Sequence, residues 1–141
     1  MGTSLIHRLQ PAMNIKDIPM IGSLMMRVSV VLLLIGLLWG IDMGIRQDFA
    51  LAPAHAHLNL VGGVLLFVFG LYYRLVPAAG GSGLARIQGW LHIIGAIVFP
   101  AGVAIVVSKG ETLVAIPIVG SLIVLVAVAL FAVIVFRTSN A

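Results

Sequence analysis

Four long apolar stretches divide this chain of 141 residues, and they constrain its fold more than any other feature. They lie at about 24–44, 55–76, 87–108 and 112–136. Each is close to the ~20 residues that an α-helix needs to cross the hydrocarbon core of a bilayer. Because 62% of the residues are apolar and only 9% are charged, a single small core cannot bury them all. We therefore expect an all-α integral membrane protein with four transmembrane helices that contact lipid.

Little of the chain lies outside these helices. Residues 1–23 form the predicted N-terminal segment, with a short surface helix after Pro11, and residues 24–136 form the predicted four-helix transmembrane domain. The sequence from Pro77 to Gly83 predicts a flexible connection. A cleavable signal peptide ending near Ala52 is the alternative interpretation of the first stretch, but the leader is too long for one. We expect one membrane domain.

Basic residues are distributed unequally between the two sides of the predicted bundle. Arg46 and Lys109 fall on one side, together with three of the four acidic residues. The positive-inside rule therefore predicts that both termini lie in the cytoplasm. We expect the protein in the inner (cytoplasmic) membrane. The eight basic groups give no indication of a nucleic-acid partner. The six basic residues on the cytoplasmic side are Arg8, Lys16, Arg27, Arg74, Arg86 and Arg137.

Three glycines recur at four-residue spacing in the first apolar stretch, at Gly36, Gly40 and Gly44. This spacing places them on one stripe of a helix, where the missing side chains allow another backbone to approach closely. Chance in a glycine-rich membrane chain is the alternative explanation. We expect a packing face here, without knowing which helix covers it.

Two histidines, His55 and His57, lie near the outer end of the second predicted helix. Ionisable side chains within membrane segments are rare and indicate function by default, although histidines after Pro53 could also cap the helix. Residues two apart on an α-helix differ by ~200° of rotation and ~3 Å of rise. The two rings therefore cannot hold one metal ion together unless the start of the helix unwinds, and they cannot supply both axial ligands of one haem. A bis-histidine haem would need a second copy of the chain.

The other histidines differ in position. His92 lies in the third predicted helix, about 15–20 Å deeper than the pair for a bilayer core of ~30 Å, so it cannot share a ligand with them. We interpret it as an interfacial histidine beside Trp90. His7 is predicted to be solvated. The chain has no cysteine, which excludes thiolate metal sites and covalently attached haem.

The segment from His55 to Pro77 resembles a helix of the catalytic subunit of the haem–copper oxidase and nitric oxide reductase superfamily. In that superfamily, a histidine followed by x-Asn near the outer end of the second helix is a low-spin haem ligand, like His57 and Asn59 here. The closing sequence from Tyr72 to Pro77 is also similar. The tenth helix of the superfamily carries a His-x-His pair whose members ligate different haems. The resemblance covers one helix in four.

This resemblance implies that the chain is similar to one of the three four-helix arcs of the twelve-helix, pseudo-threefold subunit. We therefore expect a homotrimer with haem b between adjacent copies. His57 of one copy, with His55 or another His57 of its neighbour, would ligate the iron. Gly62-Gly63 would open space against the flat ring. The other residues assigned to this site are Asn59, Phe67 and Phe69 as surroundings and Arg46 as the partner of the propionates.

The chain departs from the superfamily at the copper site, because residues 100–110 contain no histidine. Copper-assisted oxygen reduction is therefore not expected, and no catalytic residue is assigned. The sequence predicts a haem b protein for electron transfer, an oxidoreductase-like carrier with an unknown redox partner. Three alternatives remain open: a haem sensor or enzyme that binds NO or O₂, a haem-free conduit for protons or for zinc or copper, and a purely structural role.

Overall fold

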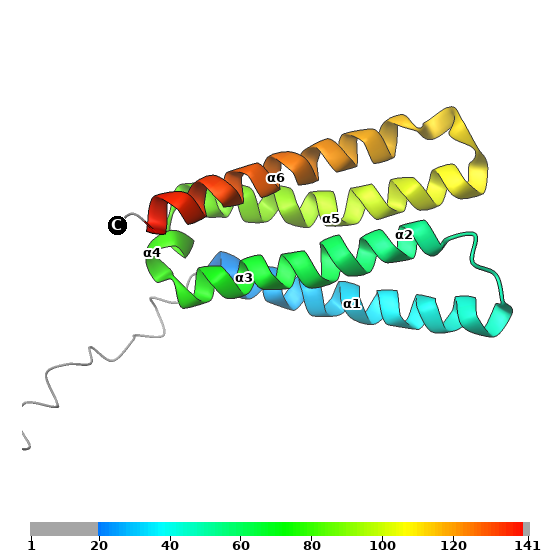
Figure 1. Cartoon of the computed structure of the whole chain (residues 1–141), viewed down its shortest axis with the longest axis horizontal. Coiled ribbons are helices and arrows are strands. Elements are labelled where there is room, and N and C mark those ends of the chain that lie inside the picture. The colour runs from blue at the N-terminus through cyan, green and yellow to red at the C-terminus, as the bar shows by residue number, and fades with distance from the viewer. Residues whose placement is uncertain (1–19, 140–141) are drawn as a thin grey trace, which may run out of the picture.

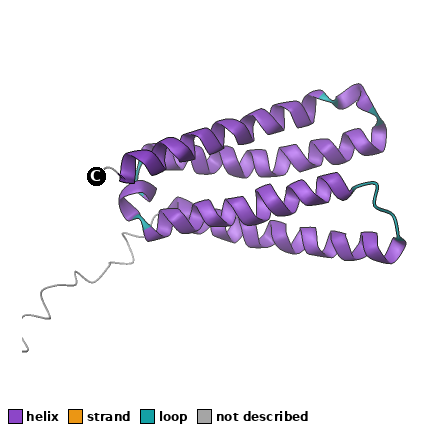
Figure 2. Cartoon of the chain, viewed as in Figure 1, coloured by secondary structure: helices purple, strands orange, loops and turns teal. Residues whose placement is uncertain are grey.

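The computed structural model describes residues 20–139, and every regular element in this range is a helix (Figure 2). The helical elements within Ala52–Leu75 follow one another without a break and form one continuous rod. Within the described range, four rods are long and apolar enough to cross a membrane, which confirms the predicted multi-pass helical architecture. In chain order the elements are α1 (Met20–Arg46), α2 (Ala52–His57), the π-helix η3 (Leu58–Leu65), α3 (Leu66–Leu75), α4 (Pro77–Gly80), α5 (Gly83–Lys109), the 3-10 helix η4 (Glu111–Leu113) and α6 (Ala115–Ser139).

The helix ends differ from the apolar stretches where local chemistry sets them. Helix α1 begins at Met20, so residues 20–23 belong to it and not to the N-terminal segment. Pro77 stands at the start of α4, where its fixed φ favours a helix over the expected flexible loop. Ser82 caps α5 by accepting a hydrogen bond from the Ala85 amide at 3.1 Å. The surface helix expected after Pro11 and the solvated His7 lie outside the described residues.

The rods run up and down, so the beginning of α1, the end of α3, α4, the beginning of α5 and the end of α6 meet at one end of the bundle (Figure 1). We call this the basic end. It carries Arg27, Arg74, Arg86 and Arg137, whereas Arg46 and Lys109 lie at the other end. Four of the six basic residues in the described range therefore lie at one end of the folded bundle.

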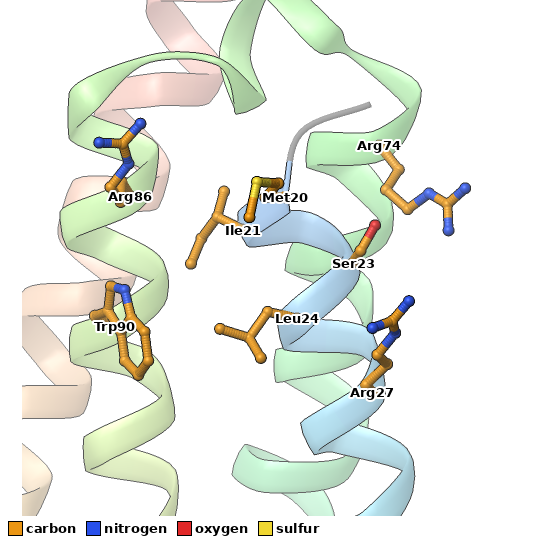
Figure 3. Close-up of a pocket in the computed structure, with 8 residues that line it drawn as sticks. All are labelled: Met20, Ile21, Ser23, Leu24, Arg27, Arg74, Arg86 and Trp90. Carbon is orange, nitrogen blue, oxygen red and sulfur yellow. The ribbon is translucent and has the colours of Figure 1, made fainter. Parts of the chain in front are cut away.

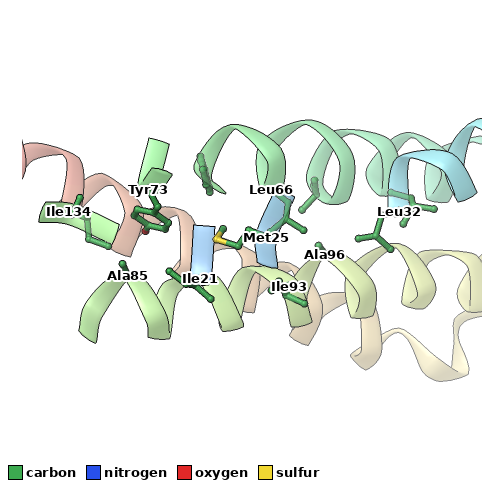
Figure 4. Packing of buried hydrophobic residues seen from close by; sticks show 13 residues of the cluster. Ile21, Met25, Leu32, Leu66, Tyr73, Ala85, Ile93, Ala96 and Ile134 are labelled. Carbon is green, nitrogen blue, oxygen red and sulfur yellow. The ribbon is translucent and has the colours of Figure 1, made fainter. Parts of the chain in front are cut away.

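Buried apolar side chains join the rods along the bundle axis (Figure 4). Met25, Leu66 and Tyr73 are fully buried, and Ile134 brings α6 into the same cluster. Small residues set the distance between α5 and α6: a Cβ at Gly102 would lie 2.6 Å from the Pro117 nitrogen. Close backbone approach of this kind replaces the hydrophobic effect as the source of helix association in lipid.

The π-helix η3 spans eight residues in the middle of the second rod. π-Helical segments are rare and are often found beside functional sites. Two carbonyl groups of η3 receive hydrogen bonds from other rods: Gly63 O accepts from Ser29 Oγ at 2.6 Å, and Val61 O lies 3.2 Å from His92 Nε2. These side chains satisfy backbone groups that would be costly to leave unpaired in lipid.

The glycine pair of η3 does not open space for a flat ring, so that expectation is wrong. A Cβ at Gly62 would lie 2.9 Å from Leu32 Cδ1, and one at Gly63 would lie 2.8 Å from Leu33 Cδ1. The missing side chains instead admit leucines of α1. The pair is therefore a packing contact between the first and second rods.

Tyr73 holds a buried amide in place at the basic end. Its hydroxyl donates to Gln88 Oε1 at 2.9 Å, and Gln88 Nε2 has no partner among the described residues. Tyr73→Phe would leave the whole amide unpaired, so we expect it to lower the free energy of unfolding by about 1–2 kcal/mol. Titration with SDS in mixed micelles, followed by circular dichroism, measures this. Tyr72→Phe is the control, since the Tyr72 ring is only half-buried; an equal loss in both variants would contradict the assignment.

Candidate cofactor-binding site

His55 and His57 both belong to α2, which is α-helical and precedes the π-helix. Their rings contact different rods, in agreement with the rotation that their spacing predicts. The His55 ring lies edge-on to the Trp39 ring of α1, with the ring centroids 6.4 Å apart. The centroid of the His57 ring lies 4.4 Å from that of the Phe99 ring of α5. Each histidine therefore has its own environment, and the two are not equivalent as ligands.

His57 is oriented by a backbone carbonyl. Its Nδ1 lies 2.7 Å from Pro53 O, and a carbonyl can only accept, so Nδ1 carries the proton. In the neutral ring Nε2 then has a free lone pair, and it has no hydrogen-bond partner among residues 20–139. Metal-binding histidines are commonly fixed in this way, with the second ring nitrogen donating to a carbonyl. His57 is half-buried and presents a prepared ligand nitrogen.

His55 has its nitrogen-bearing edge turned into the bundle. Asn59 Nδ2 lies 3.3 Å from His55 Nδ1 and 3.1 Å from His55 Nε2. A neutral imidazole has only one acceptor nitrogen, so a hydrogen bond from Asn59 occupies the lone pair that a metal would need. A Cβ at Gly40 would lie 2.8 Å from His55 Cε1, which shows how closely α1 covers this edge. In this conformation His55 is not available as a ligand.

The glycine stripe of α1 is the surface against which these side chains pack. Gly36 faces the Asn59 amide and Gly40 faces the His55 ring, whereas nothing lies within 4 Å of a Cβ at Gly44. The predicted packing face therefore exists at two of its three glycines, and the second rod covers it. Asn59 belongs to the surroundings of His55, and its buried Oδ1 has no partner in the described part of the chain.

An exposed apolar stripe continues from His57 along the second rod. It consists of Leu60, Val64 and Val68, whose side chains are 55%, 49% and 49% exposed. Such a stripe must be covered by lipid, by a flat apolar ligand or by another chain. His57 therefore stands at the edge of a surface suited to an intermolecular contact.

The predicted aromatic lining is only partly compatible with the structure. Phe69 is 6% exposed and stacks on Phe131 at 3.8 Å, so it belongs to the bundle core and its assignment to the haem surroundings is wrong. Phe67 is half-buried and follows His57 by ten residues, about 15 Å along a helix. Its role stays a prediction.

Arg46 already has an anionic partner. Its Nε lies 2.8 Å from Asp42 Oδ1 in an exposed ion pair between residues four apart on α1. A pocket of about 180 Å³ beside it is lined by Trp39, Asp42, Met43, Arg46, Asp48 and Leu51, with two carboxylates against one guanidinium. A propionate would have to displace Asp42 from Arg46. The predicted contact stays a prediction.

His92 is not interfacial, so that interpretation is wrong. Its side chain is fully buried, Nε2 lies 3.2 Å from Val61 O, and the ring packs edge-on to Phe69 at 5.0 Å. Sequence reasoning missed this role because the receiving carbonyl belongs to the π-helix, whose only signal in the sequence is a glycine pair within a helix. Among the described residues, no group of three or more His, Asp or Glu side chains could hold a metal ion, so His92 does not join the pair.

No protein-family model, no curated protein and no solved structure matches this chain. The resemblance to the haem–copper oxidase superfamily therefore rests on the residues of the second rod alone. Chemically, this rod offers one free imidazole nitrogen at an exposed apolar surface and a second imidazole held by an amide.

Proposed function

We propose that this protein is a membrane-embedded haem b protein that binds its cofactor through His57 where copies of the chain meet, and that it transfers electrons. The observation that carries the proposal is the bond between His57 Nδ1 and Pro53 O, which leaves Nε2 free beside an exposed apolar stripe. A low-spin haem with two imidazole ligands accepts and returns one electron without losing a ligand. Membrane burial favours an apolar macrocycle over a bare metal ion at such a surface.

A haem held by two imidazoles would take the second one from a neighbouring copy, because α2 cannot turn both of its histidines to one iron. In a closed ring of three copies, His57 of one copy and His55 of the next would hold each haem. His55 must then exchange its hydrogen bond with Asn59 for the iron. A ring of three requires both histidines. If each copy supplied only one ligand, the ring would have three ligands, and these cannot all be paired on haems that need two each.

The described residues begin and end at the basic end of the bundle (Figure 1), which supports an orientation with both termini in the cytoplasm of the inner membrane. The histidine pair then lies toward the outer face. Electron exchange would take place with a partner on that side.

A visible spectrum of the purified protein tests the proposal, combined with its haem content and its mass in detergent. We expect reduced-minus-oxidised bands of low-spin haem b and an oligomer with one haem per chain. Colourless protein, or zinc or copper in place of haem, would refute haem binding. A monomer that holds six-coordinate iron would refute the shared site.

The engaged lone pair of His55 favours one second candidate, a haem protein that binds a gas. If Asn59 keeps its hydrogen bond, His57 alone ligates the iron and one position stays open for NO or O₂. Carbon monoxide distinguishes the two functions, because it binds reduced iron only where a position is open. For the electron carrier we expect carbon monoxide to leave the reduced spectrum unchanged. A shifted spectrum at stoichiometric carbon monoxide would favour the gas-binding protein.

A further inference from the structure

A pocket opens at the basic end of the bundle, far from the histidine pair (Figure 3). Its volume is about 650 Å³, and it lies among the first turns of α1, the last turn of α3 and the first turns of α5. Arg27 is 13 residues from Gly40, which faces His55, so about 20 Å of helix separates the pocket from the candidate haem site. It is lined by Met20, Ile21, Ser23, Leu24, Arg27, Arg74, Arg86 and Trp90.

Positive charge dominates this pocket. Each of three rods contributes one arginine, Arg27, Arg74 and Arg86, and none of the lining residues among positions 20–139 is acidic. All three arginines are exposed, and the ion pair of Arg46 with Asp42 belongs to the opposite end of the bundle. Guanidinium groups bind phosphate oxygens in a forked geometry, so arginines on both sides of α1 offer phosphate contacts at the rim of this pocket.

The pocket also has an apolar wall, which restricts the kind of phosphate. Met20 and Leu24 of α1 lie between Arg86 on one side and Arg27 on the other (Figure 3). Trp90 is half-exposed and lies about two turns from the start of α5, and tryptophan is enriched where membrane proteins meet lipid headgroups. A free phosphate ion would leave this wall uncovered, whereas a phospholipid could cover both parts: its phosphate would meet arginines at the rim of the pocket, and its glycerol and upper acyl chains would meet Leu24 and Trp90.

We infer that this pocket binds the headgroup of an anionic phospholipid. Basic pockets between transmembrane helices on the cytoplasmic side bind such headgroups in general. The bound lipid offsets positive charge that three rods contribute to one pocket, and it contacts α1 and the neighbouring rods at this end. The inference concerns a different end of the molecule from the haem site and does not depend on it.

Fluorescence quenching by brominated lipids tests the inference at the pocket itself. The chain has two tryptophans, so Trp39→Phe leaves Trp90 as the only one. This variant is reconstituted into phosphatidylcholine vesicles that contain increasing fractions of brominated phosphatidylglycerol, and each sample is normalised to the same lipids without bromine. We expect Trp90 to report about a tenfold preference for phosphatidylglycerol, reduced by high salt.

Arginine variants in the Trp39→Phe background connect this preference with the pocket. We expect the combined variant R27Q/R74Q/R86Q to lose the preference, and R74Q and R86Q singly to reduce it about threefold each. The two single variants keep the test valid if the triple variant does not fold. Arg137→Gln is the matched control, because Arg137 is exposed at the same end of the bundle but does not line the pocket. It should keep the full preference.

Four results would overturn the inference. One is equal quenching by brominated phosphatidylcholine and phosphatidylglycerol in the Trp39→Phe protein, and another is a loss in Arg137→Gln as large as that in R74Q. Competition by inorganic phosphate as effective as that of the lipid would identify a soluble ligand instead. A preference that appears only after residues 1–19 are deleted would mean that the chain's own N-terminal segment fills the pocket.

Discussion

His57→Ala is expected to remove haem from the purified protein, while His55→Ala keeps it in an altered form. His57 Nε2 is the prepared ligand, fixed by the bond from Nδ1 to Pro53 O, and alanine deletes it. Loss of a first axial ligand from a site with no other free imidazole should lower the haem content at least about tenfold. His55→Ala removes only the ligand that arrives from the neighbouring copy. Its iron should become high-spin and bind carbon monoxide.

His92→Leu serves as the control for these variants. His92 is buried against Phe69 and Val61 and is no ligand, so this variant should be less stable but carry normal haem per folded chain. Absorbance of the haem per mole of protein, measured on the fraction that elutes with the wild-type mass, separates the two effects. Imidazole added to His57→Gly should restore part of the absorbance. Haem retained in His57→Ala but lost in His55→Ala would reverse the assignment of the two ligands.

The membrane architecture could be predicted because it depends on composition and length alone. Each apolar stretch is long enough to cross a bilayer, and lipid forces such a stretch to satisfy its own backbone as a helix. The ends of the helices were less predictable because local interactions set them. Ser82 caps α5 before the apolar residues begin, and a 3-10 helix, Glu111–Leu113, precedes α6.

The π-helix could not be predicted from periodicity. A π-helical segment of eight residues is a short insertion within an otherwise α-helical rod, and it changes the spacing of the apolar residues too little to be recognised. Its partners come from other rods: Ser29 of α1 and His92 of α5 each contact a carbonyl of η3. Leu32 and Leu33 fill the space at the glycine pair. Because of these contacts with α1, the glycine pair is a packed interface and not a surface for a flat ring. The sequence of the second apolar stretch does not show which side chains of other rods will lie against it.

The sequence predicted that the two histidine rings point to different rods, but it could not predict which ring nitrogen is free to bind a metal. Spacing within α2 sufficed to send the two rings to different neighbours. The state of each ring depends on which group lies next to its nitrogens: a carbonyl at His57 and an amide at His55. The amide is held in place by the close approach of Gly36, a residue 19 positions before His55, so only the folded arrangement distinguishes the free ligand from the engaged one.

Substitutions in the glycine stripe should show a graded loss of stability. Gly36→Ala places a methyl group in direct collision with the Asn59 amide, so either this amide leaves its position beside His55 or the two helices move apart. We expect a loss of about 2–3 kcal/mol in the free energy of unfolding. Gly40→Ala meets the His55 ring at 2.8 Å, and this ring can turn aside, so the loss should be smaller, about 1 kcal/mol.

Gly44→Ala completes the series as its matched control. A Cβ at this position meets nothing within 4 Å, so only the higher helix propensity of alanine remains, and we expect stability to be unchanged or up to about 1 kcal/mol higher. Unfolding by SDS in mixed micelles gives all three values on one scale. Because the collisions at Gly36 and Gly40 involve Asn59 and His55, equal stabilities across the series would mean that α1 does not cover the nitrogen edge of His55, and His55 would then be as free a ligand as His57.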